Sequence, residues 1–388
     1  MIYKEFKNLK LSTLGYGGMR LPVDESTGKL CPKKAEEAVD HAYNNGVNFF
    51  DTAYFYHSGE SESALGKMLA KYPRDTWYLA DKMPGNFFEI VDGKIVVDIG
   101  WANLGRKVYN NPAEIFEYQL NKCAVEYFDF YMLHNVAEST YDIYTDEKLG
   151  LVDYVLKEKE AGRIKHLGFS SHGRHGIIEK FLNKYDCFEF ALLQINYLDW
   201  SLQEANKKYD ILTKRNIPIF VMEPVRGGML AAPGTEAEKV LKTVRPSDTP
   251  ASWAFRFLQS LPNVSVIVSG MSKLEHLKEN LELFSKDDPM SEEEKVALQK
   301  VVDGMASFVP CTDCRYCCGT CPQNLDIPLL ISTYNEAAHA VSWHVEDILN
   351  TLPDEKKPQA CIDCGVCNPL CPQNIDIAEI MKKFSALL

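Results

Sequence analysis

The sequence predicts an α/β protein, a (β/α)8 barrel followed by a smaller α+β domain that contains most of the cysteines. Two observations predict the barrel. Short apolar runs alternate with amphipathic stretches over about the first 285 residues, and many runs are apolar at every position, as expected for parallel strands that are buried on both faces. A third observation, two cysteine runs of identical spacing after residue 310, predicts the smaller domain.

Each short apolar run is expected to be a strand, and each amphipathic stretch the helix that follows it. The expected strands are 47–50, 77–80, 128–133, 166–169, 191–194, 217–221 and 264–268, with a first element near 10–14. The expected helices are 33–45, 61–71, 111–124, 148–161, 173–183, 202–214, 249–261 and 273–284. Together they form about eight β/α units. A doubly wound sheet is the alternative, but no helix follows the Gly-rich segment 14–19, as a dinucleotide-binding turn would require.

The barrel is expected to span residues 1–290. A linker helix should follow over 291–306, because Ser291 can cap it and three glutamates fill its first turn. The cysteine-rich domain should then occupy 307–388, with a helical insertion over 327–352 between its two cysteine runs.

Both cysteine runs have the spacing C-x2-C-x2-C-x3-C-P. The cysteines are Cys311, Cys314, Cys317 and Cys321 in the first run, and Cys361, Cys364, Cys367 and Cys371 in the second. In this spacing the last 80 or so residues resemble the bacterial-type two-cluster ferredoxins, whose fourth cysteine ligates the other cluster. The resemblance implies two 4Fe–4S clusters. The counterpart of Cys318 is Asn368, so Cys318 is expected to be a bystander. Zinc is an alternative, though it needs neither the third cysteine nor the Cys-Pro ending; disulfides are favoured less.

Composition excludes several other classes of protein. A net charge of −12 over 388 residues argues against nucleic acid or anionic lipid as a partner. The N-terminus lacks the apolar segment of a secretory signal, and no stretch is apolar enough for a transmembrane helix. Iron–sulfur thiolates require a reducing interior, so a cytoplasmic location is expected.

Polar residues follow three neighbouring apolar runs. Asp51, Lys82 and His134 lie at or just beyond the ends of expected strands, and Tyr56 lies on the loop after Asp51. In a barrel these positions converge on the carboxyl-terminal face, where active sites are built. The set suits proton transfer to a carbonyl oxygen: an ammonium lowers the pKa of a nearby phenol, and the imidazole can orient the substrate.

Alternatives remain for each of these residues. Taken singly, a strand-end Asp or Lys is more often a structural ion-pair partner than a catalytic group. Tyr54 competes with Tyr56 as the acid, and His57 with His134. The joint placement favours the catalytic interpretation.

Residues 8–290 resemble the aldo-keto reductase family. The similar segments are 50–56, 59–66, Lys82, 129–134, 168–171, 194–197 and 223–224. The resemblance implies carbonyl reduction or alcohol oxidation with NADP(H) or NAD(H), with Tyr56 as the general acid, Lys82 and Asp51 as its tuning pair and His134 as the orienting group. It also implies a set of cofactor contacts. These are Ser170, Ser171, Gln194, Met222, Gly227, Gly228, Ser269, Gly270, Ser272, His276 and Asn280.

Several positions depart from the family pattern. His57 replaces a glycine and is expected to narrow the pocket; Ser171 replaces an asparagine, and Met222 replaces an aromatic residue. His276 lies where NADPH-preferring members often place an arginine for the 2′-phosphate, so use of NADH is also expected. The stretch 85–111, which includes Phe87, Phe88 and Trp101, is either a pocket wall or a surface elaboration.

Three functions fit the two halves together. In the first, the barrel performs nicotinamide chemistry on a small carbonyl or alcohol substrate, and the clusters exchange electrons with a redox partner protein or sense redox state. In the second, the protein transfers electrons, and its barrel binds a flavin or a partner. In the third, the barrel is a noncatalytic module, which the intact set of Asp51, Tyr56, Lys82 and His134 argues against.

Overall fold

The computed structural model describes residues 1–99, 104–305, 309, 311, 314–339 and 342–388. The chain forms two compact units. The barrel unit comprises Met1–Asn196, Lys207–Ala232 and Ser247–Ser291, and the C-terminal unit comprises Tyr197–Asn206, Pro233–Pro246 and Glu292–Leu388. Two short segments that lie between barrel elements in the sequence therefore pack with the C-terminal residues.

A closed barrel of parallel strands forms the centre of the barrel unit, in the order β10-β11-β12-β13-β3-β4-β5-β9. The strands are β3 (Leu14–Gly17), β4 (Phe49–Asp51), β5 (Tyr78–Met83), β9 (Phe128–Leu133), β10 (Ile164–Ser171), β11 (Phe190–Gln194), β12 (Ile219–Met222) and β13 (Val264–Ser269). The predicted barrel is confirmed and the doubly wound alternative is excluded, since the sheet closes on itself.

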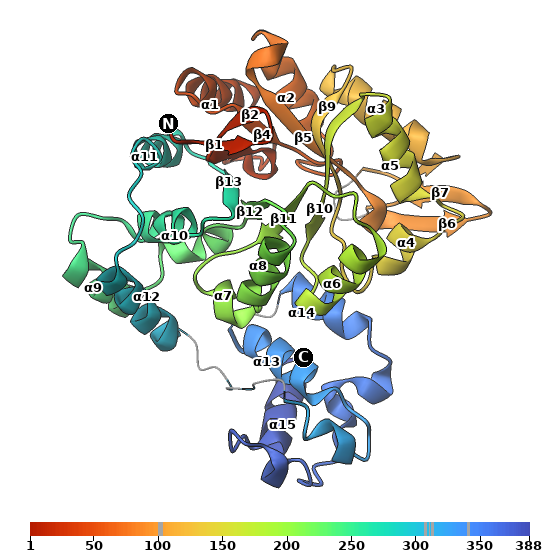
Figure 1. The fold of residues 1–388 in the computed structure, drawn as a ribbon, viewed down its shortest axis with the longest axis vertical. Coiled ribbons are helices and arrows are strands. Elements are labelled where there is room, and N and C mark those ends of the chain that lie inside the picture. Colours follow the sequence, from red (N-terminus) through yellow and green to blue (C-terminus); the bar gives the residue numbers. More distant parts are fainter. Residues whose placement is uncertain (100–103, 306–308, 310, 312–313, 340–341) are drawn as a thin grey trace. The chain divides into compact units, whose positions relative to one another are not determined.

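Helices cover the outside of these strands (Figure 1). They are α1 (Pro32–Asn44), α2 (Ser61–Leu69), α3 (Pro112–Cys123), α4 (Tyr141–Thr145), α5 (Leu151–Glu160), α6 (His175–Lys184), α8 (Ala205–Lys214), α10 (Pro250–Gln259) and α11 (Leu274–Leu283). Local sequence explains their starts. Proline occupies the first turn of α1, α3 and α10, and the side chains of Asn111 and Thr249 cap α3 and α10.

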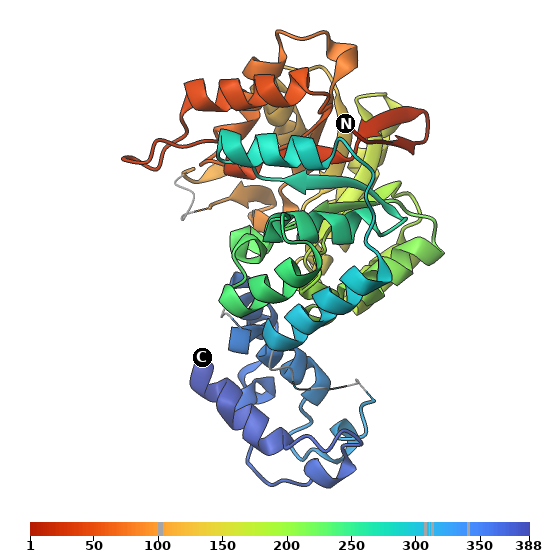
Figure 2. The same cartoon turned by 90° about the vertical axis from the view of Figure 1, so that its left-hand side faces the viewer.

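The predicted first strand near 10–14 is wrong. It straddles β2 (Leu9–Ser12), which pairs antiparallel with β1 (Tyr3–Phe6), and β3, the first barrel strand. The hairpin lies beside the barrel strands (Figure 2). It inserts Phe6 among the buried aromatic rings of the barrel, within 5.4 Å of Phe130 and 5.6 Å of Phe220 between ring centroids. Packing of this hairpin, which local pattern does not reveal, decides where the barrel begins.

The long stretch after β5 forms a sheet of its own. Its antiparallel strands are β6 (Phe88–Val91), β7 (Lys94–Val97) and β8 (Lys107–Tyr109). Asp92 and Gly93, both with positive φ, make the two-residue turn between β6 and β7. The Tyr109 hydroxyl lies 2.9 Å from the Tyr54 hydroxyl, which anchors the sheet to the barrel. Trp101, expected in this stretch, lies outside the described residues.

Helices make up the regular structure of the described residues in the C-terminal unit. They are α7 (Asp199–Leu202), α9 (Thr235–Val244), α12 (Glu292–Met305), α13 (Ile327–His339), α14 (Trp343–Asn350) and α15 (Ile377–Leu387). The expected linker helix is α12, and it packs on α9 through an ion pair of 3.0 Å between Arg245 and Glu294. The expected insertion forms α13 and α14. Buried Leu330, Val345 and Phe384 belong to the core that these helices share.

Candidate active site and cluster-binding cavities

Lys82 connects the predicted catalytic residues at the carboxyl ends of β4 and β5. Its ammonium donates hydrogen bonds to Asp51 Oδ1 at 2.7 Å and to the Thr52 carbonyl at 2.6 Å. The side chains of Lys82 and Asp51 are only 1% and 5% exposed. A buried ammonium needs such a partner, because an isolated charge is costly to remove from water. The pair therefore fixes a positive charge at the mouth of the barrel.

Tyr56 lies against this charge. The Lys82 Nζ is 4.9 Å from the centroid of the Tyr56 ring. Lys82 lowers the pKa of the phenol, as expected from the sequence, but burial has the larger effect and raises the pKa to about 12. At neutral pH the phenol is protonated and can act as an acid.

His134 is held as a neutral imidazole. Burial, followed by the nearby Lys82 and His172, keeps its pKa well below the ordinary value. The Phe55 ring stacks on it, with centroids 5.4 Å apart, and the Tyr56 ring lies edge-on at 6.4 Å. Its Nδ1 is buried without a hydrogen-bond partner among the described residues. The imidazole thus remains available for an added ligand.

His57, the alternative to His134, bonds to the backbone of the segment after β3. Its backbone has a φ of 50°, a conformation that glycine adopts without strain, which explains why a glycine suits this position. The His57 Nε2 accepts a hydrogen bond from the Leu21 amide at 2.9 Å. The side chain therefore fastens the loop after β4 to the segment after β3.

A second layer of buried polar residues supports Lys82, and sequence reasoning missed it. Asp81 accepts a hydrogen bond from the Lys82 amide at 2.8 Å, while Gln119 donates at 3.0 Å both to the Lys82 carbonyl and to Glu62. Burial raises the pKa of both Asp81 and Glu62, and the Glu62 charge raises that of Asp81 further. Both shifts favour the protonated form of these carboxyl groups.

The expected nicotinamide contacts on β10 and β11 also hold neighbouring loops. Ser170 Oγ accepts a hydrogen bond from the Asn135 amide at 2.8 Å, and Ser171 Oγ donates to the Val136 carbonyl at 2.6 Å. The Gln194 Oε1 lies 3.1 Å from His172 Nδ1. Asn135 and His172 were not predicted. The only sequence signal for them was their position next to strand-end polar residues.

The remaining expected cofactor contacts lie at the ends of β12 and β13 and on α11. Met222 ends β12, Ser269 ends β13, Gly270 follows it, Ser272 and His276 are exposed, and Asn280 is buried. Gly227 and Gly228 have φ of 66° and 104°, and Gly228 faces open space where a side chain would stand. Such a backbone can approach a phosphate closely. No side chain caps the start of α11, so its first amides remain available.

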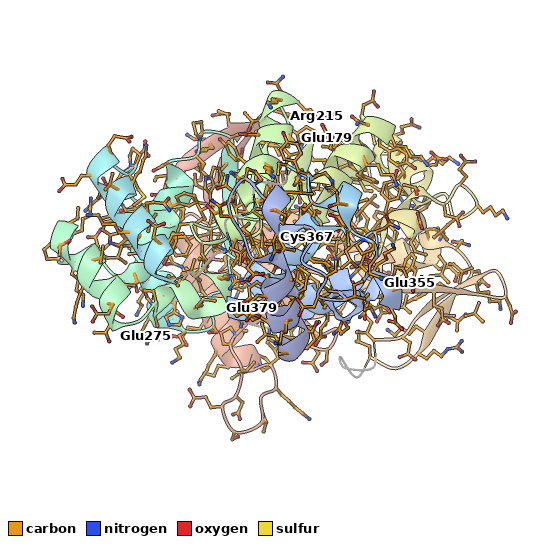
Figure 3. All side chains as sticks on the ribbon, turned by 90° about the horizontal axis from the view of Figure 1, so that it is seen from below. Glu179, Arg215, Glu275, Glu355, Cys367 and Glu379 are labelled. Atoms are coloured by element: carbon orange, nitrogen blue, oxygen red, sulfur yellow. The ribbon has the colours of Figure 1, made fainter. Side chains whose placement is uncertain are left out.

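The cysteines line two cavities in the C-terminal unit. Cys311, Cys314 and Cys317 line one cavity together with Cys371 of the other run. Cys361, Cys364 and Cys367 line the other together with Cys321. Each cavity thus takes three cysteines from one run and the fourth from the other, the exchange that two cubane clusters require. Figure 3 shows Cys367 in this unit, with Glu379 on α15. The donor set fits iron–sulfur clusters.

Cys318 and Asn368, at equivalent positions of the two runs, have different surroundings. Cys318 packs against the hydrophobic core of the C-terminal unit. Asn368 Oδ1 accepts from the amides of Ile377 and Ala378 at 2.9 and 3.3 Å, and so holds the start of α15. Cys318 lies outside both sets of cavity-lining cysteines.

Within the described parts of the chain, every helix is too short or too polar to span a membrane.

Comparison with known proteins agrees with this geometry. The model of the aldo/keto reductase family matches residues 13–303, and that of a 4Fe-4S dicluster domain matches residues 310–376. An uncharacterized oxidoreductase of Bacillus subtilis, YqkF, is 25% identical over 75% of this chain and 93% of its own length. A probable aldo-keto reductase of Glycine max is 26% identical over 59% of this chain and 60% of its own length.

Among solved structures, the fold is similar to that of the aldo-keto reductase AKR11C1 from Bacillus halodurans in its holo form. The TM-score is 0.61 at 24% identity, over 78% of this chain and 96% of the other. The family matches support two kinds of cofactor, nicotinamide and iron–sulfur, and small carbonyl compounds as the kind of substrate. The chain belongs to the aldo/keto reductase family of oxidoreductases, with a 4Fe–4S dicluster domain after its barrel.

Proposed function

We propose that the barrel reduces a small carbonyl compound, or oxidises the corresponding alcohol, with a nicotinamide cofactor, and that the C-terminal unit holds two 4Fe–4S clusters for electron exchange with a partner protein. The placement of the buried Lys82 ammonium, 2.7 Å from Asp51 and 4.9 Å from the Tyr56 ring, carries the proposal. The nicotinamide supplies a hydride to the carbonyl carbon.

Tyr56 supplies the proton that balances this hydride. Reduction adds one hydride to carbon and one proton to oxygen, and the phenol is protonated at neutral pH because burial raises its pKa to about 12. As the proton leaves, the phenolate gains the attraction of Lys82, whose own charge Asp51 holds in place. The neutral His134 orients the carbonyl oxygen by a hydrogen bond.

The nicotinamide is proposed to lie along the ends of β10 to β13. Ser170, Ser171 and Gln194 would hold the ring end, and the positive-φ Gly227 and Gly228 would admit the pyrophosphate. His276 is exposed on α11. A histidine there is a weaker partner for a 2′-phosphate than an arginine, whose guanidinium is always charged and can bond the phosphate through two N–H groups. We therefore expect little preference between NADPH and NADH.

Cluster ligation is proposed to follow the two cavities. Cys311, Cys314, Cys317 and Cys371 hold one cluster, and Cys361, Cys364, Cys367 and Cys321 hold the other. The redox partner is proposed because a cluster passes single electrons while hydride chemistry moves two.

Substitution of Tyr56 by phenylalanine tests the proposal. Turnover of a carbonyl substrate should fall by about 10²–10⁴-fold, the usual contribution of a positioned general acid. Nicotinamide affinity should stay within about twofold, because only the hydroxyl that faces the substrate is lost. Tyr54→Phe is the matched control: its hydroxyl bonds Tyr109 rather than the site, so turnover should be retained. Near-normal turnover of Tyr56→Phe with chemistry rate-limiting would refute the assignment.

A further inference from the structure

The two cysteine runs share their spacing, so each is an internal reference for the other. From Cys311 to Ile327 and from Cys361 to Ile377 the cysteines, the Pro-Gln-Asn that follows the last of them, and an aspartate before the next helix coincide. The residues around the third cysteine differ. Arg315, Tyr316 and Cys318 stand where the second run has Gly365, Val366 and Asn368.

Arg315 occupies a backbone conformation that favours glycine. Its φ is 63°, nearly the 67° of Gly365. A residue with a side chain is strained in this left-handed conformation. The guanidinium is held by Asp326, with an Nη2–Oδ2 distance of 2.7 Å. An arginine is therefore kept at a position where glycine would be less strained.

The arginine places a positive charge at one cavity only. Among the described residues that line either cavity, Arg315 is the only one with a permanently charged side chain, and it lines the cavity of Cys311, Cys314 and Cys317. In the second run the counterpart of Asp326 is Asp376, which accepts at 2.7 Å from the neutral Asn368 amide. The carboxylate is paired with a cation in the first run and not in the second.

Two facts limit this charge difference. The Arg315 side chain is 54% exposed, so water and salt screen much of its charge. On the other side, Lys356 donates at 2.8 Å to the carbonyl of Gln323, which lines the second cavity, although Lys356 itself does not line it. The expected difference between the two reduction potentials is therefore modest. The first cluster keeps the higher potential, because Arg315 lines its cavity whereas Lys356 lines neither cavity.

Positive charge beside a cluster favours the reduced, more negative state of that cluster.

We propose that the two clusters are electronically unequal, and that the cluster of Cys311, Cys314, Cys317 and Cys371 has the higher reduction potential because Arg315 lies beside it. The inference rests on the proposed presence of two clusters. An electron that enters at the second cluster then moves to the first: the second is oxidised by one electron, the first is reduced by one, and no bond or proton changes. At equilibrium the electron therefore resides mainly on the first cluster.

The test is a potentiometric titration followed by electron paramagnetic resonance on the full chain purified without oxygen. The wild type should show two potentials that differ by at least tenfold in electron affinity, about 59 mV for one electron. Arg315→Gly gives the first run the residue of the second and should lower only the higher potential. Arg315→Lys keeps the charge and should preserve most of the difference.

Three results would overturn the inference. Equal potentials in protein with about eight irons per chain would contradict the asymmetry alone. A shift of the lower potential in Arg315→Gly, with the higher potential unchanged, would do the same. About four irons per chain would contradict the proposed pair of clusters as well.

Discussion

Replacement of Lys82 by methionine tests how the buried charge supports the acid. The Lys82 Nζ lies 4.9 Å from the Tyr56 ring centroid. At this distance and an effective dielectric constant of about 20, a unit charge stabilises a phenolate by about 3 kcal/mol. Since about 1.4 kcal/mol is a factor of ten, carbonyl reduction should slow on the order of 100-fold in Lys82→Met.

Loss of Lys82 also leaves Asp51 buried and unpaired. Removal of one partner of such a pair costs about 3–5 kcal/mol of stability. The double variant Lys82→Met/Asp51→Asn removes both charges and is the matched control. It should recover much of the stability and remain about as slow as the single variant, because neither protein has the ammonium.

The assay is single-turnover reduction measured against pH, with deuterated nicotinamide to establish that hydride transfer is rate-limiting. In the wild type burial raises the pKa of Tyr56 to about 12 while Lys82 opposes that rise. Without Lys82 the pKa rises further, so alcohol oxidation, which needs the phenolate, should require higher pH. Turnover within about threefold of wild type, with an unchanged pH profile, would refute this reasoning.

Three further predictions concern the clusters, the cofactor and the acids behind Lys82. Protein purified without oxygen should carry about eight irons and eight sulfides per chain, unchanged in Cys318→Ser; stoichiometric zinc under iron-replete conditions would contradict the cluster assignment. Fluorescence titration should show less than about a hundredfold preference for NADPH over NADH, about 2.7 kcal/mol, because His276 is exposed and is not an arginine; a larger preference would contradict it. Burial raises the pKa of Asp81 in the folded protein, so its stabilising contribution is complete below its ordinary pKa and declines as pH rises through the folded value. The melting temperature of Asp81→Asn relative to wild type should therefore rise as the pH increases from about 5 to about 8. A relative melting temperature that falls over this range would disprove the upward shift of the Asp81 pKa.

Much of the barrel could be predicted from the sequence, because its strands are buried on both faces. The run at 128–133 coincides with β9 (Phe128–Leu133), and 191–194 lies within β11 (Phe190–Gln194). The first strand was misplaced because two short apolar segments lie in succession there. Only the packing of Phe6 and Leu11 with the aromatic rings of the barrel shows that the first of these segments belongs to a hairpin and not to the barrel.

The sheet of β6, β7 and β8 was predicted only as a long segment at the mouth. A signal was present, since Asp92-Gly93 between alternating apolar residues favours a hairpin. At the site, strand ends identified Asp51, Lys82 and His134 as neighbours. The contacts of Asp81 with Glu62, and of Gln194 with His172, join different elements of the barrel, and the pattern within each element does not reveal them.

The net effect on the Tyr56 pKa could not be predicted from residue types alone. A nearby ammonium and a buried environment act in opposite directions, and only the geometry shows that burial outweighs Lys82. The cluster cysteines differ in this respect, because their spacing alone predicted the exchange between runs, and the two cavities are lined by the predicted sets.

The central claim is that the barrel transfers a hydride to a carbonyl carbon while Tyr56 protonates the oxygen. Single turnover with nicotinamide deuterated at C4 follows that hydride directly. Deuterium should be found in the alcohol product of the wild-type protein, and its transfer should be slowed by about 10²–10⁴-fold in Tyr56→Phe, with nicotinamide binding intact. Tight nicotinamide binding with no deuterium in any product, across a panel of aldehydes and ketones, would contradict the account.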